Sequence, residues 1–82
     1  MIHELKTVNP FFEKVLYGDK GFEVRIDDRE YKVGDMLNLK EYIPEKDKLT
    51  GRRCLRKITY ILTHEDFPEG IKKGYVVMSI RG

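Results

Sequence analysis

The sequence has only one cysteine and no long apolar run. Its one cysteine, Cys54, excludes a disulfide within the chain, and its two histidines, His3 and His64, lie too far apart for a recognisable zinc site. No stretch approaches the roughly 18 consecutive apolar residues of a membrane span, and the N-terminal MIHELK lacks the apolar segment of a signal peptide. We therefore expect a cytoplasmic protein with no metal, no cofactor and no membrane partner.

Two common catalytic patterns are also missing. The seven glycines are dispersed among turns, so no phosphate-binding glycine loop is present. The only serine, Ser79, lacks the flanking glycines of a nucleophile elbow. At 82 residues, a chain buries only roughly 60 to 65% of the surface that it exposes when unfolded. We expect a single domain over residues 1–82 with a small core.

Charged residues are abundant but almost balanced. They make up 37% of the chain and leave a formal net charge of +2, which indicates no particular partner. Residues 45–57, EKDKLTGRRCLRK, hold six of the sixteen Lys and Arg against two acids. This segment predicts one basic patch able to meet phosphates, although a solvated loop is the simpler alternative. Its candidate nucleic-acid contacts are Arg52, Arg53, Arg56 and Lys57.

The first third of the chain predicts a strand and a short helix. Residues 2–7, IHELKT, alternate as a strand does, with His3 and Leu5 on one face. NPFFEKVLYG then indicates a helix, with Asn9 as its N-cap, Pro10 at the first helical position and Gly18 as its stop. Its core face consists of Phe12, Val15 and Leu16.

Two further strands carry carboxylates in alternating patterns. FEVRI, residues 22–26, is expected to bury Phe22, Val24 and Ile26 and to turn its charged residues to the other face. MLNLKEY, residues 36–42, places Glu41 on the same face as Leu37 and Leu39. A carboxylate there must be paired or lie at the open end of the core, because an unpaired buried charge is costly.

The remaining pattern completes a small β-rich fold. IPEKDKLTG and THEDFPEGIKKG indicate loops, RCLRKITYIL indicates a strand with a bulge or bend near residues 55–57, and YVVMSI indicates a last apolar strand. Five short strands in so short a chain favour strong curvature. We predict an α+β fold, a small half-open β-barrel of about five strands with one or two short helices.

The stretch GDKGFEVR connects this pattern to a known family. With Gly18, Lys20, Glu23 and Arg25 it matches the Gly-x-Lys-x-x-Glu-x-Arg motif that follows the first helix of ASCH domains, a branch of the PUA-like superfamily. The following VGD and the N-terminal HELK resemble a small uncharacterised bacterial and phage subgroup, and the resemblance covers nearly the whole chain. It implies a PUA-like barrel with a cleft beside the motif, in a family that works on RNA or modified nucleosides.

The resemblance leads to a candidate function and its site. We expect an RNA- or nucleotide-binding module in which Lys20 and Arg25 hold a phosphate or carbonyl and Glu23 orients the base or Arg25. Arg29 would extend the cationic rim, and Tyr42 offers a ring for stacking. The alternative without a function is that Glu23 and Arg25 form only a structural ion pair.

Two other functions stay open at this point. The resemblance also implies an enzymatic alternative, since some ASCH proteins are small amidohydrolases that use a Lys, a Thr three residues later as nucleophile, and a Glu from a later strand. Here Glu23 stands three residues after Lys20, in the place of that Thr. An amidohydrolase or ribonuclease acting on a modified nucleoside or RNA would use Lys20 with Glu23 or Glu41 as acid and base. A protein-interaction module would instead pair its apolar last strand with a partner's edge.

Overall fold

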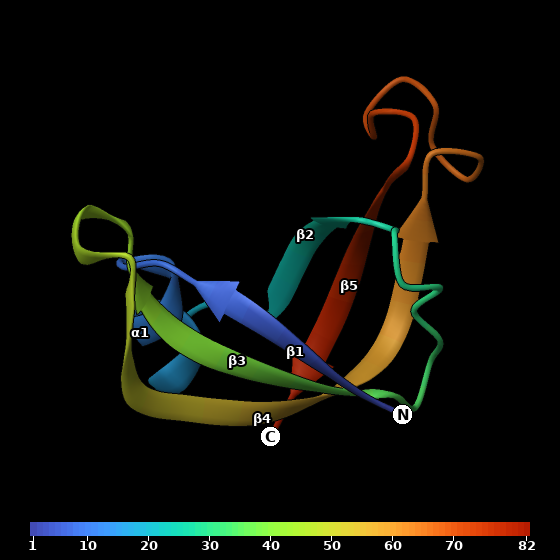
Figure 1. Cartoon of the computed structure of the whole chain (residues 1–82). Helices are drawn as coiled ribbons and strands as arrows, with labels where there is room; N and C mark the ends of the chain where they lie inside the picture. The colour runs from blue at the N-terminus through green and yellow to red at the C-terminus, as the bar shows by residue number, and fades with distance from the viewer.

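The computed structural model describes residues 1–82 as one curled β-sheet with a short helix at one end (Figure 1). The elements, in chain order, are β1 (Ile2–Thr7), α1 (Phe11–Leu16), β2 (Phe22–Ile26), β3 (Met36–Ile43), the 3-10 turn η1 (Pro44–Lys46), β4 (Lys48–Thr63) and β5 (Tyr75–Arg81). This is a small α+β half-open barrel, as the sequence predicted. None of its helices has the length and apolar character needed to cross a bilayer.

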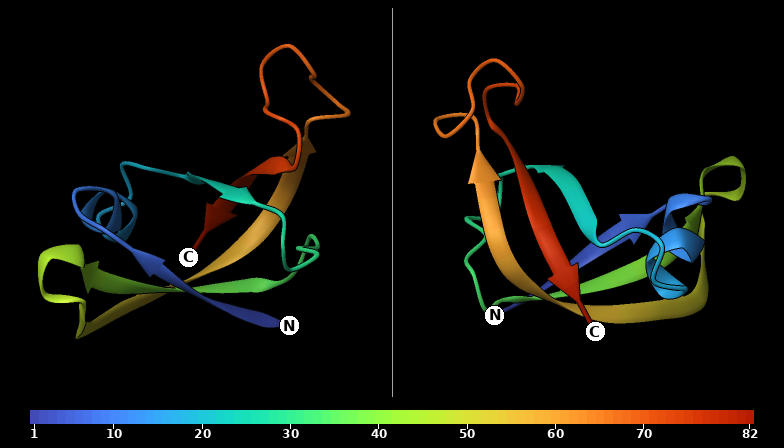
Figure 2. Two further views of the ribbon diagram at one scale, coloured as in Figure 1. Left: turned by 45° about the horizontal axis from the view of Figure 1, so that its top comes forward. Right: turned by 180° about the vertical axis from the view of Figure 1, so that it is seen from behind.

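The curvature of the sheet comes from β4. The strand order is β1-β3-β4-β5-β2, with β1 parallel to β3 and the other neighbours antiparallel. β4 pairs with β3 along its first part and with β5 along its second, and Figure 2 shows it as one bent strand that joins both halves of the sheet. A register shift between Ile58 and Tyr60 marks the bend, close to the predicted position.

The core lies inside the curl of the sheet. Leu37 and Leu39 of β3, Ile58 of β4 and Met78 of β5 are fully buried there, and Phe12 of α1 packs into the same cluster. Asn9 Oδ1 accepts the Glu13 amide at 3.0 Å, so Asn9 does satisfy a free amide at the start of the helix. The helix itself is shorter than residues 9–18, because it begins at Phe11 and Pro10 precedes it.

The predicted orientation of β2 is wrong. Phe22, Val24 and Ile26 are 48%, 52% and 54% exposed, whereas Glu23 is only 3% exposed. Glu23 stands opposite the buried Met78 of β5, and that register turns the charged face of β2 inward. Alternation separates the two faces of a strand, but the neighbouring strand decides which face is inside.

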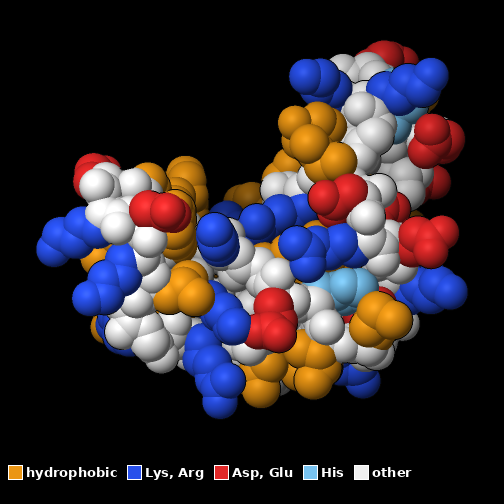
Figure 3. Space-filling model, in the orientation of Figure 1, with side chains coloured by type: hydrophobic (Ala, Val, Ile, Leu, Met, Phe, Trp, Pro, Cys, Tyr) orange, Lys and Arg blue, Asp and Glu red, His pale blue; other side chains and the backbone are white.

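The last strand does not lie where the protein-interaction alternative required it. β5 lies between β4 and β2, so both of its edges are already paired and neither is open to a partner strand. The edge strands are β1 and β2. In the space-filling view the molecule is hollowed between two arms, and Lys and Arg side chains gather at the floor of the hollow (Figure 3).

Side chains of β2 and of the turn after it reach across to β1. Arg25 Nη2 donates to the Lys6 carbonyl at 3.2 Å and to Thr7 Oγ1 at 3.1 Å, and Arg29 Nη1 donates to the Glu4 carbonyl at 3.1 Å. These bonds connect the two edge strands where no strand pairing exists. We call this boundary between β1 and β2 the seam.

Candidate functional site

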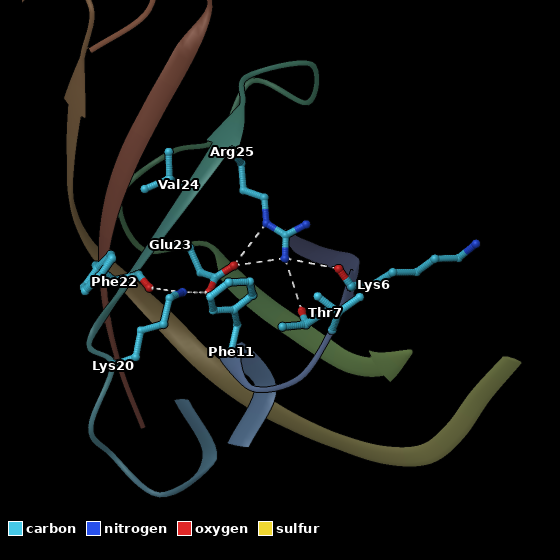
Figure 4. A pocket seen from close by; sticks show the side chains of 9 residues that line it. Lys6, Thr7, Phe11, Lys20, Phe22, Glu23, Val24 and Arg25 are labelled. Atoms are coloured by element: carbon cyan, nitrogen blue, oxygen red, sulfur yellow. Dashed lines mark hydrogen bonds and ion pairs between the residues drawn. The ribbon is translucent and has the colours of Figure 1, made fainter. Parts of the chain in front are cut away.

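A cleft of about 390 Å³ opens at the seam. β1 and the segment after it form one wall. β2, together with Lys20 from the loop before it, forms the other wall, and the ring of Phe11 lies at the start of α1 (Figure 4). We call this cavity the lysine cleft. It is lined by Lys6, Thr7, Val8, Phe11, Lys20, Phe22, Glu23, Val24 and Arg25.

The structure brings the three charged residues of the motif together in this cleft. Lys20 Nζ donates to Glu23 Oε2 and, at 2.6 Å, to the Phe22 carbonyl, while Arg25 Nε donates to Glu23 Oε1 at 3.0 Å (Figure 4). Glu23 thus holds both cations from a buried position. Two cations against one carboxylate leave the motif with an excess positive charge, and their positions are fixed before any ligand arrives.

Arg25 keeps one free donor group. Its Nε and Nη2 bond to Glu23, Lys6 and Thr7, but its Nη1 makes no hydrogen bond within the chain. The guanidinium plane is held from two sides by β2 and β1. Its remaining N–H groups are therefore oriented donors for an anion or a carbonyl oxygen.

Aromatic rings form the rim of the lysine cleft. Phe11 is 52% exposed and Phe22 is 48% exposed, and Lys20 Nζ lies 4.9 Å from the centre of the Phe22 ring. Such exposed rings beside cations suit a ligand with both a flat face and a negative charge. Sequence reasoning missed Lys6, Thr7, Phe11 and Phe22. The sequence did contain one sign that Phe11 is exposed, because Phe11 lies outside the predicted core face of the helix.

Glu41 lies outside the lysine cleft and is fully engaged elsewhere. Its carboxylate accepts bonds from Arg52 Nε at 3.0 Å, Arg52 Nη2 at 2.8 Å and Thr50 Oγ1 at 2.6 Å, and from the Asn9 amide. The Arg52 guanidinium above all lowers the pKa of Glu41 to about 2. Glu41 is thus paired, as its apolar strand face required, and it does not line the cavity that holds Lys20 and Glu23.

The predicted basic patch forms only in part, because Arg52 and Arg53 line one cavity of about 350 Å³ together with Lys40, whereas Arg56 and Lys57 do not line it. Arg53 and Lys57 stand opposite Lys40 and Met36 of β3. Arg52 binds Glu41 and Glu13, and Arg56 Nη2 donates to the Val15 carbonyl at 3.2 Å. Half of the expected phosphate contacts on this strand are therefore occupied by bonds that hold α1 to the sheet.

The two remaining candidates lie on either side of the lysine cleft. Arg29 contacts the Glu4 carbonyl and an exposed carboxylate, that of Asp28, at 3.6 Å. Tyr42 donates its hydroxyl to Asp47, and Lys6 Nζ lies 4.6 Å from the centre of its ring. Neither residue lines the lysine cleft.

Comparison with known proteins places the chain in a family without assigning it a function. The chain is 38% identical over 68 residues to a protein of Escherichia phage P2 described as an uncharacterized 12.9 kDa protein in the GpA 3′ region. That match covers 83% of the chain and 61% of the phage protein, so the chain spans less than two thirds of its relative. A family model described as Domain of unknown function (DUF3850) matches residues 2–80. With nearly its whole length matched, the chain belongs to the DUF3850 family.

Proposed function

We propose that this protein is an RNA- or nucleotide-binding module and that the lysine cleft is its site. The observation that carries the proposal is the convergence of Lys20, Glu23 and Arg25 on one cavity with the exposed ring of Phe11 at its rim. A nucleotide has a planar base and an anionic phosphate. The cleft offers a surface for each.

The contacts assign a different task to each residue. Arg25 Nη1 and the ammonium of Lys20 take the phosphate or a base carbonyl, while Phe11 stacks on the base. Glu23 positions both cations, since each bonds to one of its oxygens. Lys6 adds charge at the rim of the cleft.

We also propose that the DUF3850 chain is a minimal ASCH domain of the PUA-like superfamily. The complete Gly18, Lys20, Glu23 and Arg25 motif supports this assignment, and so does the half-open five-stranded barrel around it. A solved structure of a family member superimposed on ASCH domains would test the assignment independently of ligand binding.

Binding of a labelled six-nucleotide RNA, followed by fluorescence anisotropy, tests the function. Lys20→Ala should weaken binding, and Lys46→Ala, which removes an exposed lysine of η1, is its matched control. Phe11→Ala should cost the ~1 to 3 kcal/mol of one stacked base, roughly 5- to 150-fold in affinity. Tyr60→Ala removes an equally exposed ring outside the cleft and should have no effect.

Salt dependence separates this site from adventitious attraction. Affinity should fall as salt rises, with a slope of roughly 0.7 per phosphate neutralised on a single strand. Absence of binding at low salt, or equal losses in the Lys20 and Lys46 variants, would remove the proposal.

The enzymatic alternative has one observation in its favour. The Thr7 hydroxyl lies in the lysine cleft, 3.1 Å from Arg25 Nη2, and supplies the hydroxyl that position 23 lacks. Against it, the carboxylate of Glu23 already accepts from Lys20 and Arg25. Hydrolysis of acylated nucleosides or RNA that is lost in both Thr7→Val and Lys20→Ala would favour this alternative over simple binding.

A further inference from the structure

A second cavity of about 300 Å³ continues the lysine cleft along the seam. It shares Val24 and Arg25 with the lysine cleft, so the two cavities are neighbours on either side of the Arg25 side chain. We call it the tyrosine cavity. Its other lining residues that matter here are Asp28, Arg29, Tyr31 and Tyr75.

The tyrosine cavity has an unsatisfied polar group in its wall. Tyr31 is 6% exposed, packs edge-on against the His3 ring, and its hydroxyl has no hydrogen-bond partner. Buried hydroxyls are bonded in the large majority of cases, so an orphaned one beside a cavity indicates a partner that the chain itself does not supply. The hydroxyl oxygen has less than 1 Å² of accessible surface, so a polar ligand in the tyrosine cavity becomes such a partner once the Tyr31 side chain moves toward it.

The remaining walls match those of the lysine cleft in chemical kind. Arg29 supplies a cation that is fixed by its bond to the Glu4 carbonyl, and Tyr75 supplies a partly exposed ring. Asp28 is mostly exposed and lies 3.6 Å from Arg29. Because Arg25 lines both cavities and already bonds to the carboxylate of the lysine cleft, the excess positive charge belongs to the seam as a whole and not to each cavity separately.

Arg25 stands between these two cavities with its Nη1 unpaired. We infer that the seam binds two successive nucleotides of a single-stranded nucleic acid, one in each cavity, with the phosphate that joins them on Arg25. This inference rests on the proposed function and extends it from a single nucleotide to a strand. Tyr75 stacks on the second base, and the Tyr31 hydroxyl bonds to its edge or to its ribose.

The test compares one nucleotide with two. Calorimetric titration with adenosine monophosphate and with the dinucleotide pApA, in RNA and DNA forms, gives the ratio of the two affinities. The wild-type protein should bind pApA at least about tenfold more tightly, because a second base stacks. Tyr75→Ala should lower this ratio by about fivefold or more, and Tyr60→Ala, the control, should leave it unchanged.

Tyr31→Phe isolates the hydroxyl without emptying the core. It keeps the ring against His3 and removes an unpaired buried hydroxyl, so the melting temperature should not fall while the preference for pApA falls by about threefold or more. A preference for RNA over DNA that disappears in Tyr31→Phe would assign the hydroxyl to the ribose. Equal loss with RNA and DNA would assign it to the base edge.

The failures of the two proposals are distinguishable. If AMP and pApA bind equally well and Tyr75→Ala changes neither, the two-nucleotide site is overturned while binding in the lysine cleft stands. If neither ligand binds, both proposals fail. If Tyr75→Ala lowers the ratio but Tyr31→Phe does not, the role given to the Tyr31 hydroxyl is overturned.

Discussion

Glu23 is the residue on which the lysine cleft depends. It is buried on the inner face of an edge strand, and each of its oxygens accepts a bond from one of the two cations. Long cationic side chains lose considerable rotamer entropy when they are immobilised by a ligand. By fixing Lys20 and Arg25 in advance, Glu23 reduces that cost, although its own charge repels the phosphate that they attract.

These two effects of Glu23 oppose each other, and Glu23→Gln separates them. Two like charges about 7 Å apart repel by roughly 2 kcal/mol at an effective dielectric constant near 20, which exceeds the ~1 kcal/mol of lost pre-ordering. We expect Glu23→Gln to bind a short RNA several-fold more tightly at about 50 mM salt, with that advantage shrinking at about 300 mM. The weakened ion pairs should lower the free energy of unfolding by about 1 to 3 kcal/mol.

Anisotropy titrations at the two salt concentrations, with urea unfolding of the same samples, check this expectation. Weaker binding of the Gln variant at low salt would mean that Glu23 contacts the ligand itself, for example by accepting a bond from a base amine. In that case its role as a positioning residue would be wrong.

At the scale of the element, β2 shows that a strand with alternating residues can turn either of its two faces toward the core. Its apolar residues face outward at the edge of the sheet, and its charged residues face the seam. The register with β5 imposes this orientation, because Glu23 and Arg25 stand opposite the inward-facing Met78 and Val76. The charges are thereby placed where a ligand can reach them.

A matched pair of alanine substitutions tests whether the apolar face of β2 points outward. Ile26→Ala removes a side chain that is 54% exposed, whereas Ile58→Ala removes one that is fully buried in the middle of β4. We expect less than about 1 kcal/mol of lost stability for Ile26 and about 2 to 5 kcal/mol for Ile58. Equal losses in chemical denaturation would show that β2 buries its apolar face in solution.

The sequence predicted most of the elements, and it failed where a distant strand decides the outcome. Caps, turns and alternation are local, so the strands, the short helix and the bend in β4 were found close to their places, except that β4 begins at Lys48, inside the segment 43–51 that was predicted to be a loop. The inner face of β2 depends on β5, which lies more than fifty residues further along the chain. Phe11 and Thr7 join the lysine cleft only because the sheet curls β1 toward β2, and no short-range pattern contains that information.

At the scale of the whole molecule, two carboxylate clusters hold the ends of the central region of the fold. Asp35 precedes β3, where its Oδ2 lies 2.8 Å from His3 Nε2 and its Oδ1 accepts from the N-terminal ammonium. Glu41, near the other end of β3, connects this strand with β4 and with the start of α1 through Arg52 and Asn9. β1, β3, β4 and α1 are all tied together by these two groups.

These clusters predict the response of the fold to acid. The bonds to His3 and to Arg52 lower the pKa values of Asp35 and Glu41 from 3.8 and 4.5 to about 2 in the folded protein. The unfolded chain therefore takes up these protons at a higher pH than the folded one does. The stability that both groups contribute is fully present above about pH 4.5 and is lost as the pH falls toward 2.

Glu41→Gln should remove one of the two acid-sensitive contributions. The variant should be less stable than the wild type at pH 7, because Arg52 loses its charged partner, yet its stability should decline less steeply between pH 5 and pH 3. Urea unfolding at these three pH values measures both effects, with Glu69→Gln, an exposed carboxylate in the 64–74 loop, as the control. Parallel pH profiles for the Glu41 variant and the wild type would show that Arg52 does not shift the titration of Glu41, and the acid sensitivity of the fold would then have to originate at Asp35.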